Sequence, residues 1–274
     1  SLLRRQVATE LEAVAEQLGT PRRSLLTNAA PSVARASKSA PVLEIADSAC
    51  RVLLSTTGRM VRVDLAATEG ETVEVTTPAR RSKHDAIRSA VDVSVRGDLG
   101  AITSAGRIVR FTPVDLPSVP ATSVQLAAGT RVDQYLALAK NETVVALVPL
   151  VESPAVALGT AQGVVKRVAA SEITNKPEVE IIALKPGDRV VGAAPAPDDA
   201  ELVFVTTDVQ LLRFDASAVR PQGRSAGGMA GIRVAAGESV VSFDVVARDA
   251  EDAIVVTVAG PSAALAGADA GTAK

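Results

Sequence analysis

Basic side chains recur at one point of a repeated phrase, and this recurrence is the clearest chemical signal in the sequence. Each copy joins an apolar run, a turn residue and a second run that carries Lys or Arg. The turn residues are Gly58, Gly106, Gly163, Val209 and Gly271. The basic residues after the first four turns are Arg59, Arg62, Arg107, Arg110, Lys166, Arg167 and Arg213. Because guanidinium groups grip phosphate in a bidentate way, such a series would suit a long anionic partner.

The same residues also have a purely structural interpretation. Charged side chains on exposed strands prevent sheets from pairing edge to edge, so the series could simply protect strand edges. Its repetition at a nearly constant spacing favours an anion-binding rim. We therefore predict all seven residues as phosphate contacts and keep edge protection as the alternative.

A basic loop follows the first copy of the phrase. It contains Arg80, Arg81 and Lys83, and a loop of this kind can clamp phosphates. We predict these three residues as further contacts.

The segment 220–234 is the most distinctive string of the chain. It holds four glycines within the nine residues 223–231, bracketed by Arg220, Arg224 and Arg233. Glycines let the backbone approach another group closely. No Gly-Lys-Ser/Thr follows them, which argues against a Walker-type nucleotide site. The three arginines complete the predicted set of contacts.

The composition of the chain neither indicates nor excludes a basic, anion-binding surface. The formal net charge is −2, but acidic and basic residues occupy different stretches, and a nearly neutral protein can still present a basic face. Hydrophobic residues make up 47% of the 274 residues and aromatic residues 2%. The strands should therefore pack through β-branched and small side chains.

Residues suited to catalysis are scarce. His84 is the only histidine, which removes any His-based triad or metal cluster. We predict Tyr135, the only tyrosine, to be a half-buried strand residue and Cys50, the only cysteine, to be a buried, inert thiol. A single cysteine allows no internal disulfide, which fits a reducing cytoplasm, and no apolar run has the length of a membrane helix.

The elements that would position the basic residues are β-strands. After residue 41 the chain reads as short β-rich runs between turn residues, and the turn residues are 48, 57, 46 and 62 positions apart. Self-similarity at roughly 40–50 residues is typical of a radial or solenoidal β-repeat, and a four-stranded blade fits this spacing.

The N-terminal region differs from the rest. Leu3, Val7, Leu11, Val14 and Leu18 form one apolar helical stripe, which predicts a helix over 1–20. We interpret it as the end of a coiled-coil helix, with a plain capping helix as the alternative. Residues 21–41 should be a linker, and 42–274 a β domain of about four blades plus a truncated fifth. Both chain ends are expected to be cuts in a longer polypeptide.

Several of these strings resemble the C-terminal domain of the A-type subunit of bacterial type IIA topoisomerases, the family that contains DNA gyrase and topoisomerase IV. The resemblance lies in residues 56–62, 160–167, 220–224 and 231–234, and in the helical leader 10–23. It spans nearly the whole chain. The 220–234 string is its most specific part.

The resemblance implies a β-pinwheel, a disc of blades whose basic perimeter bends or wraps duplex DNA. It implies an ATP-dependent parent enzyme that uses Mg, dimerises through regions absent here and works with an ATPase B-type subunit in the cytoplasm. The nucleophilic tyrosine and the ATP site belong to those absent regions. No cofactor, no catalytic residue, no metal and no membrane contact are expected in this chain.

One departure from the family pattern concerns the basic loop. Gyrases carry a basic box with a Gly-Gly pair after the first blade, whereas residues 79–85 here keep the two arginines and a lysine without that pair. In the family this box is tied to wrapping DNA for negative supercoiling. Its loss favours a topoisomerase IV-like enzyme. The alternative from a different class is a propeller-type protein-interaction scaffold without DNA affinity.

Overall fold

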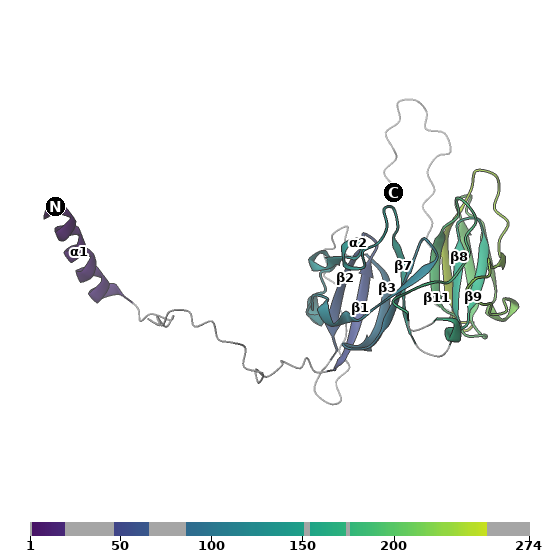
Figure 1. Ribbon diagram of the computed structural model, residues 1–274, viewed down its shortest axis with the longest axis horizontal. Helices are drawn as coiled ribbons and strands as arrows, with labels where there is room; N and C mark the ends of the chain where they lie inside the picture. Colours follow the sequence, from purple (N-terminus) through teal and green to yellow (C-terminus); the bar gives the residue numbers. More distant parts are fainter. Residues whose placement is uncertain (1, 20–46, 66–85, 151–153, 174–175, 251–274) are drawn as a thin grey trace, which may run out of the picture. The chain divides into compact units, whose positions relative to one another are not determined.

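The computed structural model describes residues 2–19, 47–65, 86–150, 154–173 and 176–250. The chain divides into two compact units, Ser1–Glu44 and Ile45–Lys274, which are described separately. In the first unit, helix α1 spans Leu2–Leu18 (Figure 1). Its side chains, including those of the apolar stripe, are exposed. The predicted helix is confirmed. The predicted linker 21–41 lies outside the described residues.

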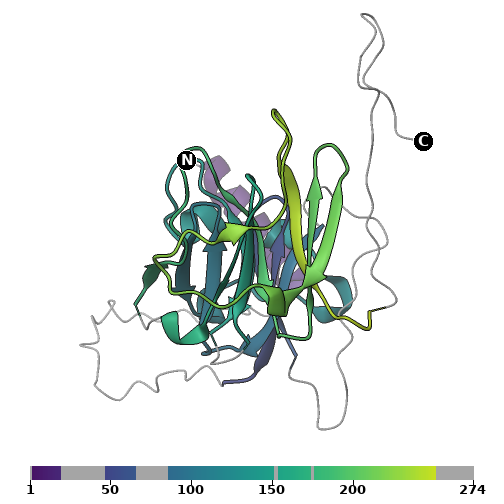
Figure 2. The same cartoon turned by 90° about the vertical axis from the view of Figure 1, so that its right-hand side faces the viewer.

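The described strands of the second unit form four antiparallel sheets (Figures 1 and 2). Sheet A has the order β3 (Ile87–Ser94), β1 (Ala49–Ser55), β2 (Arg59–Asp64) and β6 (Thr130–Arg131). Sheet B has the order β10 (Glu178–Glu180), β5 (Arg107–Phe111), β4 (Leu99–Thr103) and β7 (Val144–Pro149). Sheet C has the order β11 (Val190–Pro195), β8 (Val156–Thr160), β9 (Val164–Val168) and β14 (Met229–Ala230). Sheet D has the order β13 (Leu211–Asp215), β12 (Glu201–Thr206) and β15 (Val240–Val246).

Each sheet is built around one copy of the repeated phrase, because the two runs of the phrase form its central hairpin. A third strand, β3, β7, β11 or β15, pairs with the first strand of that hairpin. In sheets A, B and C the outer strand comes from the following repeat, as β6, β10 and β14 respectively. The prediction of four-stranded blades is confirmed for these sheets, and sheet D has three strands within the described residues. The predicted truncated fifth blade lies outside the described residues.

Short helical segments lie in the connections before and after the outer strands. They are η1 (Pro113–Asp115), η2 (Ala121–Ser123), η3 (Leu126–Ala128), η4 (Ala170–Glu172), η5 (Ala216–Ala218) and the one-turn helix α2 (Val132–Tyr135). In sheet A, η2 and η3 contribute to a small cluster of buried apolar residues over the hairpin, together with Leu53 and Val61.

The apolar cores lie between successive sheets. Sheets A and B meet around Leu54, Leu99 and Phe111, B and C around Ile102 and Leu158, and C and D around Phe204 and Phe243. Strands β4 and β8 are buried along their whole length, because each is covered on both faces. Such strands read as continuous apolar runs in the sequence.

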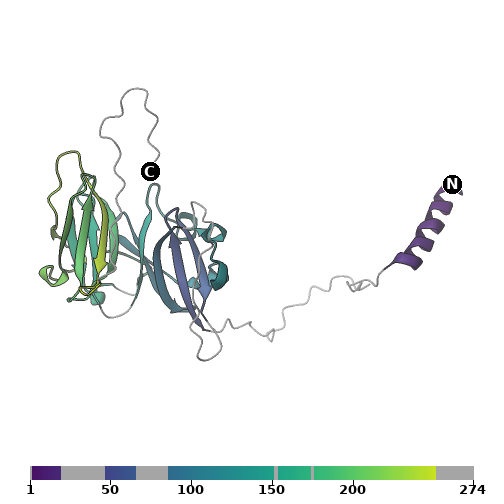
Figure 3. The ribbon, with the colours of Figure 1, turned by 180° about the vertical axis from the view of Figure 1, so that it is seen from behind.

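The strands β3, β7, β11 and β15 form the inner side of the arrangement. Neighbours in this series contact one another: β3 with β7, β7 with β11 and β11 with β15. Together they line a cavity of about 490 Å³. The outer strands β6, β10 and β14 lie at the opposite edges of their sheets. Figure 3 shows the sheets from behind.

Candidate nucleic-acid interface

The turn of the repeated phrase positions the basic residues, and it is built in the same way in each sheet. A Ser or Thr ends the first strand, and its carbonyl oxygen accepts the N–H of the turn residue at 3.0–3.1 Å. The turn residue has a positive φ of 74° at Gly58, 79° at Gly106, 82° at Gly163 and 63° at Val209. The prediction that Val209 occupies the glycine position is therefore confirmed, although a β-branched residue is strained there.

The fourth residue after the turn is an arginine in every sheet, and in sheets A and C its side chain turns inward. Arg62 donates to the carbonyl oxygens of Pro113 and Val114 at 3.2 and 2.9 Å. Arg167 donates to those of Ala216, Val219 and Ala196 at 2.9–3.2 Å. Their side chains are only 12% and 3% exposed.

Both arginines also have a carboxylate partner. Arg62 pairs with Asp64 at 2.8 Å, and Arg167 pairs with Asp198 at 2.5 Å. Both side chains therefore fasten the helical turns that follow, η1 and η5, onto the preceding sheet. We predicted these two residues as phosphate contacts, and the structure instead surrounds their guanidinium groups with protein acceptors.

The equivalent arginines of sheets B and D pair with an acidic residue 12 positions earlier, directly before β4 in sheet B and at the start of β12 in sheet D. Arg110 contacts Asp98 at 2.5 Å, and Arg213 forms an ion pair with Glu201. Their side chains are 21% and 44% exposed. The predicted charge is present at the surface here, but it is compensated within the same sheet.

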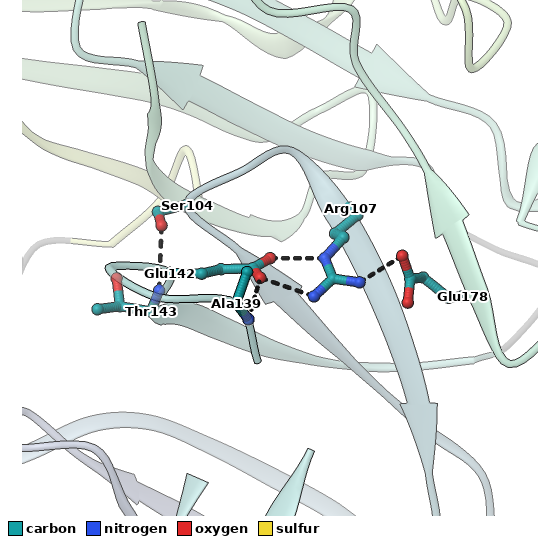
Figure 4. A network of polar contacts seen from close by, with 6 residues as sticks. All are labelled: Ser104, Arg107, Ala139, Glu142, Thr143 and Glu178. Carbon is teal, nitrogen blue, oxygen red and sulfur yellow. Dashed lines mark hydrogen bonds and ion pairs between the residues drawn. The ribbon is translucent and has the colours of Figure 1, made fainter. Parts of the chain in front are cut away.

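The residue directly after the turn is also basic in sheets A and B. Arg59 donates from Nη1 to the carbonyl oxygen of Gly129 at 2.9 Å. Arg107 lies between two carboxylates, with Glu142 at 2.6 Å on one side and Glu178 on the other (Figure 4). Glu178 belongs to β10, which the next repeat contributes, so Arg107 ties that repeat to sheet B.

Glu142 is the buried member of this network. Its side chain is 4% exposed, and it also accepts the N–H of Ala139 at 3.1 Å (Figure 4). Hydrogen bonding to Arg107 lowers the pKa of Glu142 to about 2. Both groups are therefore charged at neutral pH and hold each other in place.

Lys166 is the third predicted contact that the structure buries. Its side chain is fully buried, and Nζ donates to the carbonyl oxygens of Arg224 and Ala226 at 2.8 and 2.7 Å. Burial lowers the pKa of Lys166 to about 8. Because both acceptors lie in the glycine-rich segment, Lys166 holds that segment against β9.

The glycine-rich segment runs along the outer edge of sheet C. Its Met229 and Ala230 form β14, and a Cβ atom on Gly228 would lie 2.7 Å from the carbonyl oxygen of Val165. The N–H of Gly231 reaches the carbonyl oxygen of Gly163 at 2.9 Å. The predicted close backbone approach is therefore made to the protein's own sheet.

Three arginines of this segment are exposed, and we call them the arginine edge: Arg220, Arg224 and Arg233. Among the described residues, no carboxylate lies within ion-pair distance of their guanidinium groups. They precede and follow the outer strand β14 of sheet C in the sequence, and none of them lines the inner cavity. Arg80, Arg81 and Lys83 lie outside the described residues.

The single tyrosine and the single cysteine both belong to the apolar core around sheets A and B. Tyr135 is half-buried as predicted, but it lies in helix α2 rather than in a strand, because the chain turns there to enter β7. Its hydroxyl donates to the carbonyl oxygen of Thr112 at 3.1 Å. Cys50 is buried as predicted, and burial raises the pKa of its thiol to about 11. Within the described ranges, no group of three His, Cys, Asp or Glu residues could hold a metal ion.

Sequence reasoning missed the carboxylates that compensate the repeated arginines. The spacing of 12 between Asp98 and Arg110, repeated between Glu201 and Arg213, was visible in the sequence and could have revealed two of these pairs. Glu142 and Glu178 lie one or more strands away from Arg107 along the sequence, so no local sequence pattern predicts these pairs.

Comparison with known proteins identifies related chains. A model of the family described as "DNA gyrase C-terminal domain, beta-propeller" matches residues 101–150, 155–197 and 200–247. The A-type subunit of DNA gyrase from Staphylococcus epidermidis is 26% identical over 178 residues, which cover 63% of this chain and 20% of that protein. Its counterpart from Mycobacterium tuberculosis is 30% identical over 165 residues, covering 58% and 19%. The chain thus spans about a fifth of the length of these curated relatives.

Solved structures agree with the fold. The crystal structure of the C-terminal domain of DNA topoisomerase IV superimposes with a TM-score of 0.56 at 18% identity, covering 74% of this chain and 62% of the other. The E. coli ParC C-terminal domain gives a TM-score of 0.53 at 16% identity, covering 73% and 80%. Among the described residues, no helix is long and apolar enough to cross a membrane.

Proposed function

Because the chain belongs to the DNA gyrase C-terminal domain, beta-propeller family, we propose that its β domain binds and bends duplex DNA for a type IIA topoisomerase. The domain itself carries out no chemistry. The parent enzyme uses ATP and Mg, works in the cytoplasm and is completed by an ATPase B-type subunit. It dimerises through regions that precede this chain.

The arginine edge is the observation that supports this proposal. Arg220, Arg224 and Arg233 are exposed, lack an ion-pair partner among the described residues and border the outer strand of sheet C. By contrast, Arg62, Lys166 and Arg167 are engaged with backbone carbonyls, so we leave them out of the proposed surface. The binding surface is therefore assigned to the connections that form the sheet edges.

Binding at such an edge relies on the charge of the phosphates. Each arginine displaces counterions from the DNA backbone, so affinity falls steeply with salt and carries no base readout. Contacts at successive sheet edges compensate the energy of bending the duplex. Lys166 supports the surface indirectly, because it fixes the backbone that carries Arg224.

A retardation assay with one linear duplex across a salt series tests the proposal. The triple variant Arg220→Gln, Arg224→Gln, Arg233→Gln should weaken binding and lower the salt slope by about 3, roughly one unit per phosphate contact. The matched control replaces Arg51, Arg213 and Arg248 with Gln, because these three arginines are already paired with carboxylates.

Either of two results would contradict the arginine edge. An equal loss in the control triple would mean that only the overall charge matters. Absence of duplex binding at low salt would contradict DNA binding altogether and favour the protein-interaction scaffold.

We further propose that the parent enzyme is topoisomerase IV-like rather than a supercoiling gyrase. The support is the sequence of residues 79–85, which keeps Arg80, Arg81 and Lys83 without a Gly-Gly pair. The test is to reconstitute the full enzyme with its B-type partner, ATP and Mg on relaxed plasmid. Relaxation and decatenation without negative supercoiling are expected, and the introduction of negative supercoils would refute this assignment.

A further inference from the structure

A second cavity lies between sheets A and B, on the side of the repeated turns. It measures about 580 Å³ and is bordered by the turn 55–58, by Arg88 at the start of β3, by α2 and by the loop 138–144. Cavities of this size hold small ligands in many proteins. The DNA contacts proposed above lie at the outer edge of sheet C, whereas this cavity is lined by residues of the inner strands β3 and β7.

The charges around this cavity do not balance. Its lining contains the carboxylates Asp133 and Glu142, and both are already paired, with Arg131 at 2.5 Å and with Arg107 at 2.6 Å. The remaining lining cations are Arg88 and Lys140. For these two, the described part of the chain offers no ion-pair partner.

Arg88 is held in a fixed position by uncharged groups. Its Nε donates to the carbonyl oxygen of Val145 at 3.1 Å, and its Nη2 lies 3.4 Å from that of Val191. These bonds anchor the guanidinium between β3, β7 and β11 without neutralising it. Burial and the nearby positive charge of Arg189 both lower the pKa of Arg88, which is the direction expected for a cation without a counter-charge.

We propose that this cavity binds a phosphate-type oxyanion between Arg88 and Lys140. Nη1 of Arg88 makes no hydrogen bond to the described residues and can donate to the anion, while the ammonium of Lys140 adds a second charge from the facing loop. The hydroxyl of Thr56 lies in the same lining and can complete the set of donors. An arginine and a lysine from separate elements are a common phosphate-binding combination.

Thermal unfolding in inorganic phosphate tests the site. Phosphate replaces chloride at constant ionic strength and pH 7. Phosphate also stabilises proteins through exclusion from their surface, so the site-specific part is the difference between variants. The wild-type Tm should rise by about 5 °C or more beyond that of Lys140→Gln at a phosphate concentration a hundred times Kd.

The matched control is Lys185→Gln, which removes an exposed lysine that does not line the cavity and should behave like the wild type. Arg88→Gln should also lose the phosphate-dependent rise. If Arg88→Gln does not fold, Lys140→Gln still decides, because Lys140 is exposed and makes no hydrogen bond to the described residues. Equal rises in the wild type, Lys140→Gln and Lys185→Gln would overturn the proposal.

A second measurement identifies the source of the phosphate. If a free phosphate compound is the ligand, Lys140→Gln should retain wild-type duplex affinity in the retardation assay while losing the effect of inorganic phosphate. If a DNA phosphate occupies the cavity, Lys140→Gln should lower both. The first measurement uses inorganic phosphate and no DNA. The phosphate site can therefore be confirmed even if the arginine edge does not bind DNA, and DNA binding can be confirmed even if the phosphate site is refuted.

Discussion

Sheets C and D contain the same arginine at the same point of the repeated phrase, and they use it in opposite ways. Arg167 of sheet C is 3% exposed and bonded to three carbonyl oxygens, two of them in the helical turn after β13 and one directly after β11. Arg213 of sheet D is 44% exposed and paired with Glu201 on the adjacent strand. The difference teaches that a repeated residue type does not guarantee a repeated role.

Whether the arginine turns inward or stays at the surface correlates with the residue 12 positions before it. Sheet D has Glu201 there, which offers a charge at the surface, whereas sheet C has Ala155, which offers nothing. Arg167 instead donates to the carbonyl oxygens of Ala216, Val219 and Ala196. Sheets A and B follow the same rule, with Cys50 before the inward Arg62 and Asp98 before the paired Arg110.

Truncating the inward arginine should have the largest effect. Arg167→Met keeps the apolar stem but removes the donor to the carbonyl oxygens of Val219 and Ala196, while that of Ala216 keeps the N–H of Val219. Loss of a buried, hydrogen-bonded charge costs about 3–5 kcal/mol. Urea unfolding followed by circular dichroism should show a loss of this order. A loss below about 1 kcal/mol would mean that the connection finds other partners and that sheet C does not depend on its arginine.

In sheet B a single arginine, Arg107, has one buried partner, Glu142, and one exposed partner, Glu178. The pKa of Glu142 is lowered from 4.5 to about 2, so its contribution to stability is present above pH 4.5 and is lost as the pH falls from 4.5 to 2. A shift of this size corresponds to on the order of 3 kcal/mol. Glu142→Gln should therefore be less stable at pH 7 and should flatten the acid-unfolding profile.

Glu178 is the matched control for Glu142, because its side chain is 54% exposed and contacts the same Arg107. Glu178→Gln should change the free energy of unfolding by less than about 1 kcal/mol and keep the acid profile. Equal losses from both variants would remove the distinction between buried and exposed partners.

These contrasts show how far the sequence leads. The hairpins were predictable, because each turn residue needs a positive φ and stands between two β-rich runs. The exchange of outer strands was not, because β6, β10 and β14 have two or three residues each and too few side chains to form a periodic pattern. Strand exchange also decides that Glu178 contacts Arg107. The position of Arg107 could therefore be predicted from the sequence, but its carboxylate partner could not.

The residue at the turn position allows sheets A, C and D to be compared at smaller energies. Gly163 of sheet C has φ +82°, and a Cβ atom would lie 2.2 Å from the carbonyl oxygen of Ile232, so Gly163→Ala should cost about 2 kcal/mol or more. Gly58 has φ +74° with nothing within 4 Å, so Gly58→Ala should cost only about 1 kcal/mol. Val209→Gly should instead stabilise sheet D by about 1 kcal/mol, because it relieves a strained β-branched residue.

Thermal unfolding of these three variants gives the order directly. The predicted ranking from least to most stable is Gly163→Ala, Gly58→Ala, wild type and Val209→Gly. Destabilisation by Val209→Gly would show that the exposed valine side chain contributes more than the positive φ costs.

The smallest effect is expected at Arg213, and it is the sharpest test of the comparison. Because Arg213 is 44% exposed and its ion pair with Glu201 is reached by solvent from that side, Arg213→Met should change the free energy of unfolding by less than about 1 kcal/mol. The coupling measured with Glu201→Gln should shrink in high salt. Arg167→Met, with the same change of side chain, should keep most of its effect in high salt, because three of its four acceptors are carbonyl oxygens and only the pair with Asp198 is ionic. If the two arginines gave equal losses with equal salt dependence, burial would not distinguish them, and the repeated phrase would have one role after all.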